Sequence, residues 1–277
     1  MIITVVGLGV VGGSFIKALK GQGHEVYGVD IDVETLARAK ADGCIKEGYI
    51  DGSEIIKVSD MTIICLYPSL VLDYIKTHEF KKGSIITDAV GVKTHFLNEA
   101  MALLKDKDVE FVSGHPMAGR ENKGYLYASK EVFQGANYIL IQHEQNSRQA
   151  IAMMEQFVTN LGFHSVKIMS PEAHDEVISF TSQLPHVIAV SLIDSDSQKY
   201  DTGKYIGDSY RDLTRIADIN EELWTELFFN NKDNLLNSIQ NFENQLDIIK
   251  EAIKDEDSET LKSMFKESSK RRRSLEK

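Results

Sequence analysis

The sequence predicts an α/β protein in which a doubly wound, parallel sheet is followed by an all-helical C-terminal domain. Short β-branched runs alternate with helix-like segments through the first 168 residues, and β-rich runs stop after Ser170. Strands that read as continuous apolar runs are typical of parallel sheets, because helices cover both of their faces. We therefore predict two domains, residues 1–168 and residues 169–277.

The first domain is expected to consist of strands that alternate with helices. Two apolar runs near its end, 137–141 and 164–168, flank an amphipathic helix from about Ser147 to Asn160 and are expected to extend the same sheet. The other expected strands are 2–6, 25–29, 61–66, 84–88 and 109–113, and the helices between them are 10–21, 33–42, 69–78 and 93–104.

The second domain is expected to begin at Ser170. Ser170 is a suitable N-cap, Pro171 suits the first helical position, and Glu172 places a carboxylate in the first turn. Helical spacing then continues over 171–200, 207–217, 219–253 and 257–275.

The chain carries 42 acidic and 31 basic side chains, which give a net charge of -11. An anionic body repels nucleic-acid phosphates and acidic lipid headgroups, so neither nucleic acid nor a membrane is an expected partner. Cys44 and Cys65 form no metal-binding pattern, and no metal is expected. The apolar N-terminal run has no basic leader and soon meets Lys17 and Lys20, so we expect a soluble, cytoplasmic protein.

A glycine-rich turn lies between the first expected strand and the first expected helix, a context that favours a dinucleotide-binding, Rossmann-type domain. The first glycine permits a tight turn, the second lets the backbone approach a pyrophosphate, and the third lets helix and strand pack closely. The helix N-terminus offers unpaired amides to the phosphates. The predicted cofactor-binding residues of this loop are Gly7, Leu8, Gly9, Val10, Val11 and Gly12.

Asp30 ends the second expected strand, eighteen residues after Gly12. A carboxylate at this place accepts hydrogen bonds from the ribose hydroxyls of adenosine. It also disfavours a 2′-phosphate, because the nearest arginine, Arg38, is not adjacent. Asp30 is thus predicted to bind ribose, and NAD is the predicted cofactor. The alternative is a cap on the next helix, a role that Asp32 could fill.

His115 lies just past the strand expected at 109–113. Ligands of open α/β sheets bind at the carboxyl edge of the sheet, so His115 can face the cofactor. A neutral imidazole is suited to take the proton of an alcohol while hydride leaves the carbon. His115 is therefore the predicted catalytic base. The alternative is a turn residue that satisfies backbone groups.

Polar side chains also gather in the helix expected at 171–200. Ser182 and His186 are four residues apart and project from one face, and His174 lies on a neighbouring stripe. Pro185 removes a helical hydrogen bond and is expected to kink the helix among them. The grouping indicates a functional face. A core histidine satisfied by backbone groups is the alternative.

Arg211 and Arg215 are also four residues apart, with Asp212 beside them. Guanidinium groups bind carboxylates in a bidentate manner, so this pair predicts a local anion site in an acidic protein. The alternative is a surface helix whose arginines pair with Asp208, Asp212 and Asp218.

Three motifs together resemble the prephenate dehydrogenase family of tyrosine biosynthesis: GHPMAG at 114–119, LPH at 184–186 and RDLTRIA at 211–217. The resemblance covers nearly the whole chain in consistent order. It implies the NAD+-dependent oxidative decarboxylation of prephenate to 4-hydroxyphenylpyruvate, CO2 and NADH. It also implies a homodimer built through the helical domain.

The resemblance implies roles for individual residues. It makes His115 the acceptor of a hydrogen bond or proton from the 4-hydroxyl of prephenate. It assigns a substrate carboxylate to Arg215, with Arg211 nearby. Ser182 and His186 match positions that line the substrate pocket, and we group His174 with them as a predicted substrate-binding residue.

Three positions near the predicted pocket differ among relatives. Glu121 matches a pocket-edge acid in some members. Arg120 replaces a small hydroxyl residue and adds a cation that could meet a substrate carboxylate or pair with Glu121. Gly91 stands where some relatives have a serine that helps to hold the substrate hydroxyl, so His115 could act with a backbone amide or water instead.

Two alternative functions follow from the same residues. Arogenate dehydrogenase shares the fold and the motifs. A dinucleotide-binding regulatory protein would keep the glycine loop without the chemistry, and the joint presence of His115, His186 and Arg215 argues against it.

Overall fold

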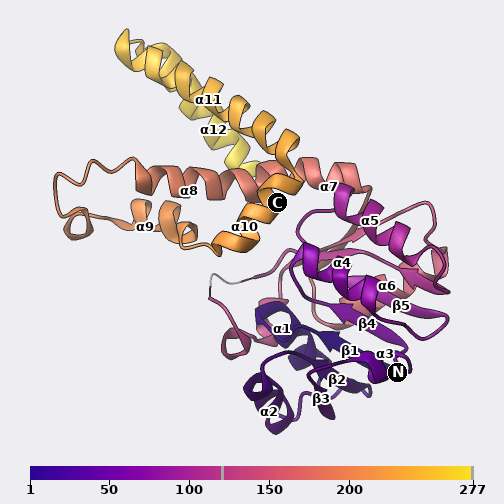
Figure 1. Ribbon diagram of the computed structural model, residues 1–277. Helices are drawn as coiled ribbons and strands as arrows, with labels where there is room; N and C mark the ends of the chain where they lie inside the picture. Colours follow the sequence, from indigo (N-terminus) through magenta and orange to yellow (C-terminus); the bar gives the residue numbers. More distant parts are fainter. Residues whose placement is uncertain (120–121, 276–277) are drawn as a thin grey trace. The chain divides into compact units, whose positions relative to one another are not determined.

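The protein is described by a computed structural model that covers residues 1–119 and 122–275. The chain forms two compact units, Met1–Asn231 and Lys232–Lys277 (Figure 1). The larger unit contains the sheets and the helices that cover them. The smaller unit is a pair of helices, α11 (Lys232–Lys254) and α12 (Ser258–Ser274).

A six-stranded sheet forms the centre of the larger unit, with strand order β3-β2-β1-β4-β5-β6 and parallel pairing throughout. The connections from β1 and from β4 run in opposite directions along the sheet, which creates a switch point beyond their carboxyl ends. The predicted doubly wound sheet is therefore confirmed, with β3 and α3 as short elements that the sequence did not predict. The strands are β1 (Ile2–Val6), β2 (Glu25–Val29), β3 (Glu47–Tyr49), β4 (Met61–Ile64), β5 (Ser84–Asp88) and β6 (Val109–Phe111), and the helices between them are α1 (Val10–Leu19), α2 (Val33–Ala41), α3 (Ser53–Ile56), α4 (Pro68–Thr77) and α5 (Thr94–Leu104).

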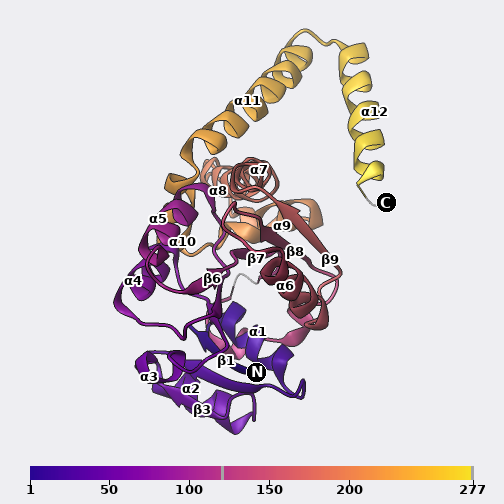
Figure 2. The ribbon, with the colours of Figure 1, turned by 90° about the vertical axis from the view of Figure 1, so that its right-hand side faces the viewer.

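Alternate residues of the central strands face opposite sides of this sheet. Val5 and Ile63 belong to one apolar cluster, while Val6 and Ile64 belong to the other. Helix α1 and helix α6 (Arg148–Asn160) contribute to the first cluster, and α4 and α5 contribute to the second (Figure 2). Both faces are thus covered, which explains why the strands read as continuous apolar runs.

A second, three-stranded sheet follows, with order β7-β8-β9. The expectation that 137–141 and 164–168 extend the first sheet is wrong. The chain passes from one sheet to the other at Val112 and Ser113, because Val112 N–H donates to Ile86 O of β5 whereas Ser113 O accepts from Ile141 N–H of β8. The strands of the second sheet are β7 (Gly114–Pro116), β8 (Asn137–Ile141), antiparallel to β7, and β9 (Ser165–Met169), parallel to β8.

Helices complete the larger unit, and the first of them is interrupted. The single helix expected at 171–200 is instead α7, a π-helical turn at Ser179–Gln183, and α8, which ends at Asp194. Leu184 N–H bonds to Ser179 O in this turn, just before Pro185, so the kink expected at the proline takes the form of a π turn. The elements are α7 (Pro171–Ile178), α8 (Leu184–Asp194), α9 (Asp208–Thr214), α10 (Glu221–Asn230) and 3-10 turns at Tyr125–Tyr127, Lys130–Val132, Thr202–Lys204 and Arg215–Ala217.

A further expected helix is not continuous in the structure. The helix expected at 219–253 is divided at Asn231 into α10 and α11.

Within the described residues, the stretch Pro171–Asp194 is long and apolar enough to cross a membrane. One such stretch is weak evidence for a membrane span, since apolar helices that pack against protein have the same composition.

Candidate active site

The glycine loop between β1 and α1 is shaped for close backbone packing. Gly7 has φ +81°, and a Cβ atom there would lie 2.6 Å from Cys65 O. A Cβ atom at Gly12 would lie 1.8 Å from Gly7 O, so neither position admits a side chain. A Cβ atom at Gly9 would meet nothing within 4 Å, and helix α1 begins at Val10. The loop therefore leaves open space at the N-terminus of α1, which suits a pyrophosphate.

Asp30 lies directly beside this loop. Its Oδ2 accepts a hydrogen bond from Leu8 N–H at 2.7 Å, and its Oδ1 accepts one from Asp32 N–H at 2.9 Å. Asp32 caps α2, because its side chain accepts from Glu34 N–H. The capping role thus belongs to Asp32, and Asp30 stays at the nucleotide end of β2. The side chain of Leu8 is buried in the core, so only the backbone of Leu8 faces the loop.

His115 occupies the middle of β7, opposite Ile139 of β8. Its Nδ1 lies 2.9 Å from Nε2 of His174, and Nδ1 of His174 lies 2.8 Å from Oδ1 of Asp175. His174 and Asp175 are consecutive residues of α7, and both are buried. We call His115, His174 and Asp175 the relay. Sequence reasoning placed His174 near the substrate and missed Asp175.

Backbone amides at the start of α5 hold Asp175 in place. Lys93 N–H donates to its Oδ1 at 2.8 Å, and Thr94 N–H donates to its Oδ2 at 2.7 Å. The side chain of Lys93 is completely buried, and its Nζ donates to Asp88 Oδ1 at 2.6 Å and to Gly114 O at 2.7 Å. Lys93 therefore connects β5 to β7 immediately beside His115.

Burial controls the protonation of these groups. Desolvation lowers the pKa of His115 well below its ordinary value, and the charges of His174 and Lys93 act in the same direction. Desolvation also lowers the pKa of His174. Burial by itself would raise the pKa of Asp175, but hydrogen bonds from His174 and Thr94 outweigh it, and the net pKa is lowered. At neutral pH the relay thus consists of two neutral imidazoles and one carboxylate.

Gly91 and Leu227 flank the other edge of the His115 ring. A Cβ atom at Gly91 would lie 3.7 Å from His115 Nε2 and 3.4 Å from Leu227 Cδ2. Leu227 is fixed by Gln183, whose Nε2 donates to Leu227 O at 3.0 Å. Asn231 joins these elements, since its Nδ2 donates to Gln183 Oε1 and to Asp175 O. Nε2 of His115 therefore lies beside Gly91, which presents no side chain to it.

His186 lies two residues into α8, in the segment that follows the π turn. Its Nδ1 lies 2.9 Å from Ser182 O, and a carbonyl only accepts, so Nδ1 carries the hydrogen and Nε2 is left as an acceptor. The imidazole packs against Trp224 of α10 in a tilted arrangement, with ring centroids 3.6 Å apart. The predicted pair Ser182 and His186 is thus brought together, and Trp224 fixes the ring of His186.

Family models match both halves of the chain. The nucleotide-binding domain of prephenate dehydrogenase matches residues 15–167, and the dimerization domain of prephenate dehydrogenase matches residues 170–267. The chain belongs to the prephenate dehydrogenase family. The predicted family and fold class are confirmed, and so is the prediction of an NAD-dependent oxidoreductase.

Individual relatives cover nearly the same length. A prephenate dehydrogenase of Lactococcus lactis subsp. cremoris is 31% identical over 290 residues, which cover 99% of this chain and 77% of the relative. A crystal structure of prephenate dehydrogenase from A. aeolicus, in complex with hydroxyphenyl propionate and NAD+, has a TM-score of 0.91 at 29% identity and covers 99% of this chain and 98% of the other. Synechocystis arogenate dehydrogenase has a TM-score of 0.84 at 26% identity, covering 99% of this chain and 100% of the other.

The two arginines of this prephenate dehydrogenase family member lie at the end of α9. Arg211 pairs with Asp208 at 3.2 Å, and both side chains are exposed. The regular helix ends at Thr214 and Arg215 begins a 3-10 turn, but Arg215 N–H still donates to Arg211 O, so Arg215 follows Arg211 by one helical turn. This turn packs against α8, the helix that carries His186. Arg120 and Glu121 lie outside the described residues.

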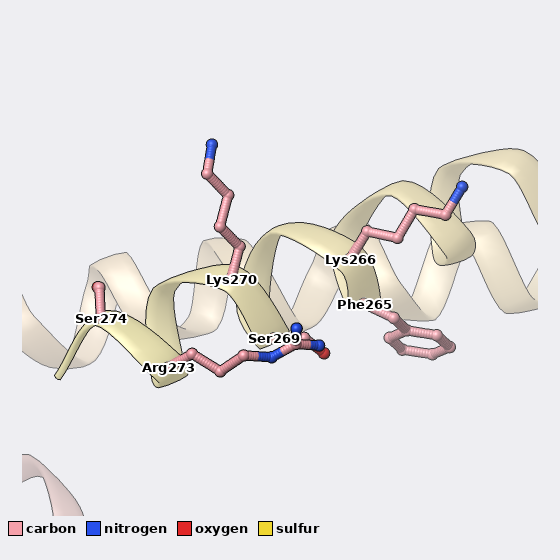
Figure 3. A pocket seen from close by; sticks show the side chains of 6 residues that line it. All are labelled: Phe265, Lys266, Ser269, Lys270, Arg273 and Ser274. Carbon is pink, nitrogen blue, oxygen red and sulfur yellow. The ribbon is translucent and has the colours of Figure 1, made fainter. Parts of the chain in front are cut away.

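A hollow in the described part of the smaller unit contains none of the groups that this chemistry needs. It has a volume of about 570 Å³ and lies on α12 (Figure 3). Its lining side chains are exposed, and none of them is a candidate acid, base or nucleotide-binding group of the site above. The lining residues are Phe265, Lys266, Ser269, Lys270, Arg273 and Ser274.

The position of Gly91 beside His115 predicts the effect of adding a hydroxyl group there. Gly91→Ser is expected to raise kcat/KM for prephenate by about 2- to 10-fold, the value of one ordinary hydrogen bond. The new Cβ would have only ordinary contacts, and the hydroxyl would reach the space beside His115 Nε2. Steady-state kinetics of Gly91→Ser and Gly91→Ala check this, and equal kcat/KM values in the two variants would contradict it.

Proposed function

We propose that this protein catalyses the NAD+-dependent oxidative decarboxylation of prephenate to 4-hydroxyphenylpyruvate and CO2, with His115 as the base. The observation that carries the proposal is the neutral His115 ring, whose Nδ1 is hydrogen-bonded within the protein and whose Nε2 lies beside Gly91, a residue with no side chain. An imidazole held in this way can accept a proton from an alcohol.

The reaction divides into two bond-breaking events. NAD+, when bound, supplies the hydride acceptor. As hydride leaves C4 of the ring, Nε2 of His115 takes the proton of the 4-hydroxyl group. The bond from C1 to the ring carboxylate then breaks, its electron pair enters the ring, and the phenol oxygen recovers the proton from His115. The gain of aromaticity supplies much of the driving force.

Several side chains around His115 are proposed to contact the substrate. Ser182 and His186 present polar groups from the π turn and the start of α8. Arg215 is proposed to bind a carboxylate of the substrate, with Arg211 nearby. Arg120 and Glu121 remain predicted substrate-binding residues at the edge of the pocket. Both ring nitrogens of His174 are hydrogen-bonded within the protein, so we assign it to the relay in place of the predicted substrate contact.

The nucleotide is proposed to bind along the loop Gly7–Gly12, with its phosphates at the N-terminus of α1. Asp30 is proposed to accept hydrogen bonds from the adenosine ribose, because it lies against the loop and does not cap α2. The role of Asp30 is tested by comparing the rate of NADH formation from NAD+ with the rate of NADPH formation from NADP+. A protein that used both cofactors equally would remove the ribose role of Asp30.

Replacement of Arg215 with alanine is expected to raise KM for prephenate by about 10- to 100-fold, the loss of one hydrogen bond to a charged group. Arg211→Ala is the matched control, since Arg211 already pairs with Asp208 on the surface. Steady-state kinetics of the two variants check this. A KM unchanged in Arg215→Ala and raised in Arg211→Ala would transfer the anion site to Arg211.

The relay also predicts the pH dependence of the proposed reaction. The base must be neutral, and burial lowers the pKa of His115 well below the ordinary value near 6.5. The value of kcat/KM is therefore expected to stay constant through neutrality and to fall only as the pH drops through the lowered pKa. A pH profile of kcat/KM checks this, and an acid limb centred at or above the ordinary value would contradict it.

Arogenate is the alternative substrate, and the likeness to an arogenate dehydrogenase is the observation that favours it. Measurement of NADH formation with prephenate and with arogenate decides between the two. We expect a higher kcat/KM with prephenate. NAD binding without turnover of either substrate would favour the regulatory alternative.

We also propose a homodimer built through the helical domain, residues 169–277, with the nucleotide domain at 1–168. The match to a dimerization domain at 170–267 supports this. Exposed apolar side chains on the helices would be covered in a dimer, among them Leu213, Phe229 and Leu246. Light scattering on the purified protein is expected to give twice the chain mass. The protein is proposed to be soluble and cytoplasmic.

A further inference from the structure

The relay is a chain of two hydrogen bonds that ends on a buried carboxylate. Nδ1 of His115, the two nitrogens of His174 and Oδ1 of Asp175 lie in series, at 2.9 Å and 2.8 Å. His174 and Asp175 are 0% and 1% exposed, so solvent does not compete for these bonds. Which nitrogen of each histidine carries the hydrogen is therefore decided by the donors and acceptors of the relay and its protein neighbours, without water.

Asp175 can only accept in this setting. Its two oxygens already receive the backbone N–H groups of Lys93 and Thr94, which favours the ionised carboxylate. His174 must then donate from Nδ1, which leaves its Nε2 as an acceptor. Consequently His115 must donate from Nδ1, and its own Nε2 carries the lone pair. The opposite order would place an unprotonated His174 Nδ1 against a carboxylate oxygen, two acceptors without a hydrogen between them.

We propose that Asp175, acting through His174, holds His115 in the tautomer whose Nε2 can take a proton from substrate. This inference rests on the proposed function, in which His115 is the base. His174 and Asp175 are positioning residues, because neither reaches the Nε2 edge of His115. The charge of Asp175 also matters when His115 becomes an imidazolium during the reaction, since the carboxylate is joined to that ring through His174 and has the opposite sign.

Asp175→Asn tests whether the carboxylate sets which nitrogen of each histidine carries the hydrogen. Asparagine has one accepting oxygen in place of two and carries no charge, so His174 is no longer held as a donor from Nδ1 and the order of the hydrogens is no longer fixed. The expected result is a fall in kcat of about 10²- to 10⁴-fold with little change in NAD affinity. Glu176→Gln is the matched control, since it removes a neighbouring, exposed carboxylate of the same helix and is expected to leave kcat unchanged.

A pair of variants at His174 keeps the test decisive if Asp175→Asn does not fold. In His174→Gln the side chain can accept from His115 and donate to Asp175, which preserves the order of the hydrogens. In His174→Leu it can do neither. We expect His174→Gln to retain at least about tenfold more kcat than His174→Leu. Equal kcat values in the two variants would overturn the proposal.

The tautomer of His115 can be read without any substrate. Long-range proton–nitrogen spectra of protein with ¹⁵N-labelled histidine distinguish the two tautomers, and His115→Asn identifies the His115 signals. We expect hydrogen on Nδ1 in the native protein and an increased share of the tautomer with hydrogen on Nε2 in Asp175→Asn. Hydrogen on Nε2 in the native protein would overturn the proposal. This measurement remains decisive even if the protein does not oxidise prephenate, so the two failures can be told apart.

Discussion

Replacement of His115 with asparagine is expected to lower kcat by about 10²- to 10⁴-fold, the usual loss when a general base is removed. Asparagine can still donate a hydrogen bond toward His174, so the relay keeps its partner, but no group at this place can take a proton. The glycine loop is formed by other residues, and NAD affinity is expected to survive. Turnover with prephenate and nucleotide titration measure the two quantities.

A surface histidine provides the control for this variant. His95 lies on α5, is 66% exposed and pairs with Glu99, so His95→Asn is expected to change neither kcat nor NAD affinity. An unchanged kcat in His115→Asn would remove His115 from the mechanism.

Replacement of Lys93 with alanine is expected to lower the free energy of unfolding by about 3–5 kcal/mol, the usual result of breaking a buried ion pair. Both partners of this pair are completely buried. The variant would leave the Asp88 carboxylate without its cation and Gly114 O without its donor. Denaturant unfolding of the native protein and the variant measures the difference.

Two further variants distinguish the effect of leaving a buried carboxylate unpaired from the effect of removing any lysine. Lys40 pairs with Glu47 on the surface, and Lys40→Ala is expected to change the free energy of unfolding by less than about 1 kcal/mol. Asp88→Asn combined with Lys93→Met removes both charges, and it is expected to be more stable than Lys93→Ala alone. A Lys93→Ala protein as stable as Lys40→Ala would contradict the role given to the buried pair.

The parts of the fold that depend on local pattern could be predicted from the sequence. The first five expected strands and the glycine loop lie where apolar runs and glycines indicated. The pairing of β8 could not be predicted, because it depends on the passage of the chain between two sheets at Val112 and Ser113. The run 109–113 reads as one strand, yet its hydrogen bonds go to different partners along its length.

The candidate site could likewise be predicted only in part. His115 could be singled out because it follows a strand at the carboxyl edge of the sheet. Asp175 and Lys93 could not, because they are 82 residues apart in the sequence and only tertiary packing brings them together. A lysine also reads as a surface residue, and nothing in its neighbours signals complete burial. The signal available was the pair Asp88 and Lys93 on either side of a short glycine-containing loop.

The central claim is that this chain oxidises and decarboxylates prephenate in a single active site that contains His115. The most direct test incubates the purified protein with NAD+ and prephenate and quantifies NADH, 4-hydroxyphenylpyruvate and CO2. We predict equal amounts of the three products, all lost together in His115→Asn. NAD binding with none of these products, or NADH formation that His115→Asn leaves intact, would contradict the account.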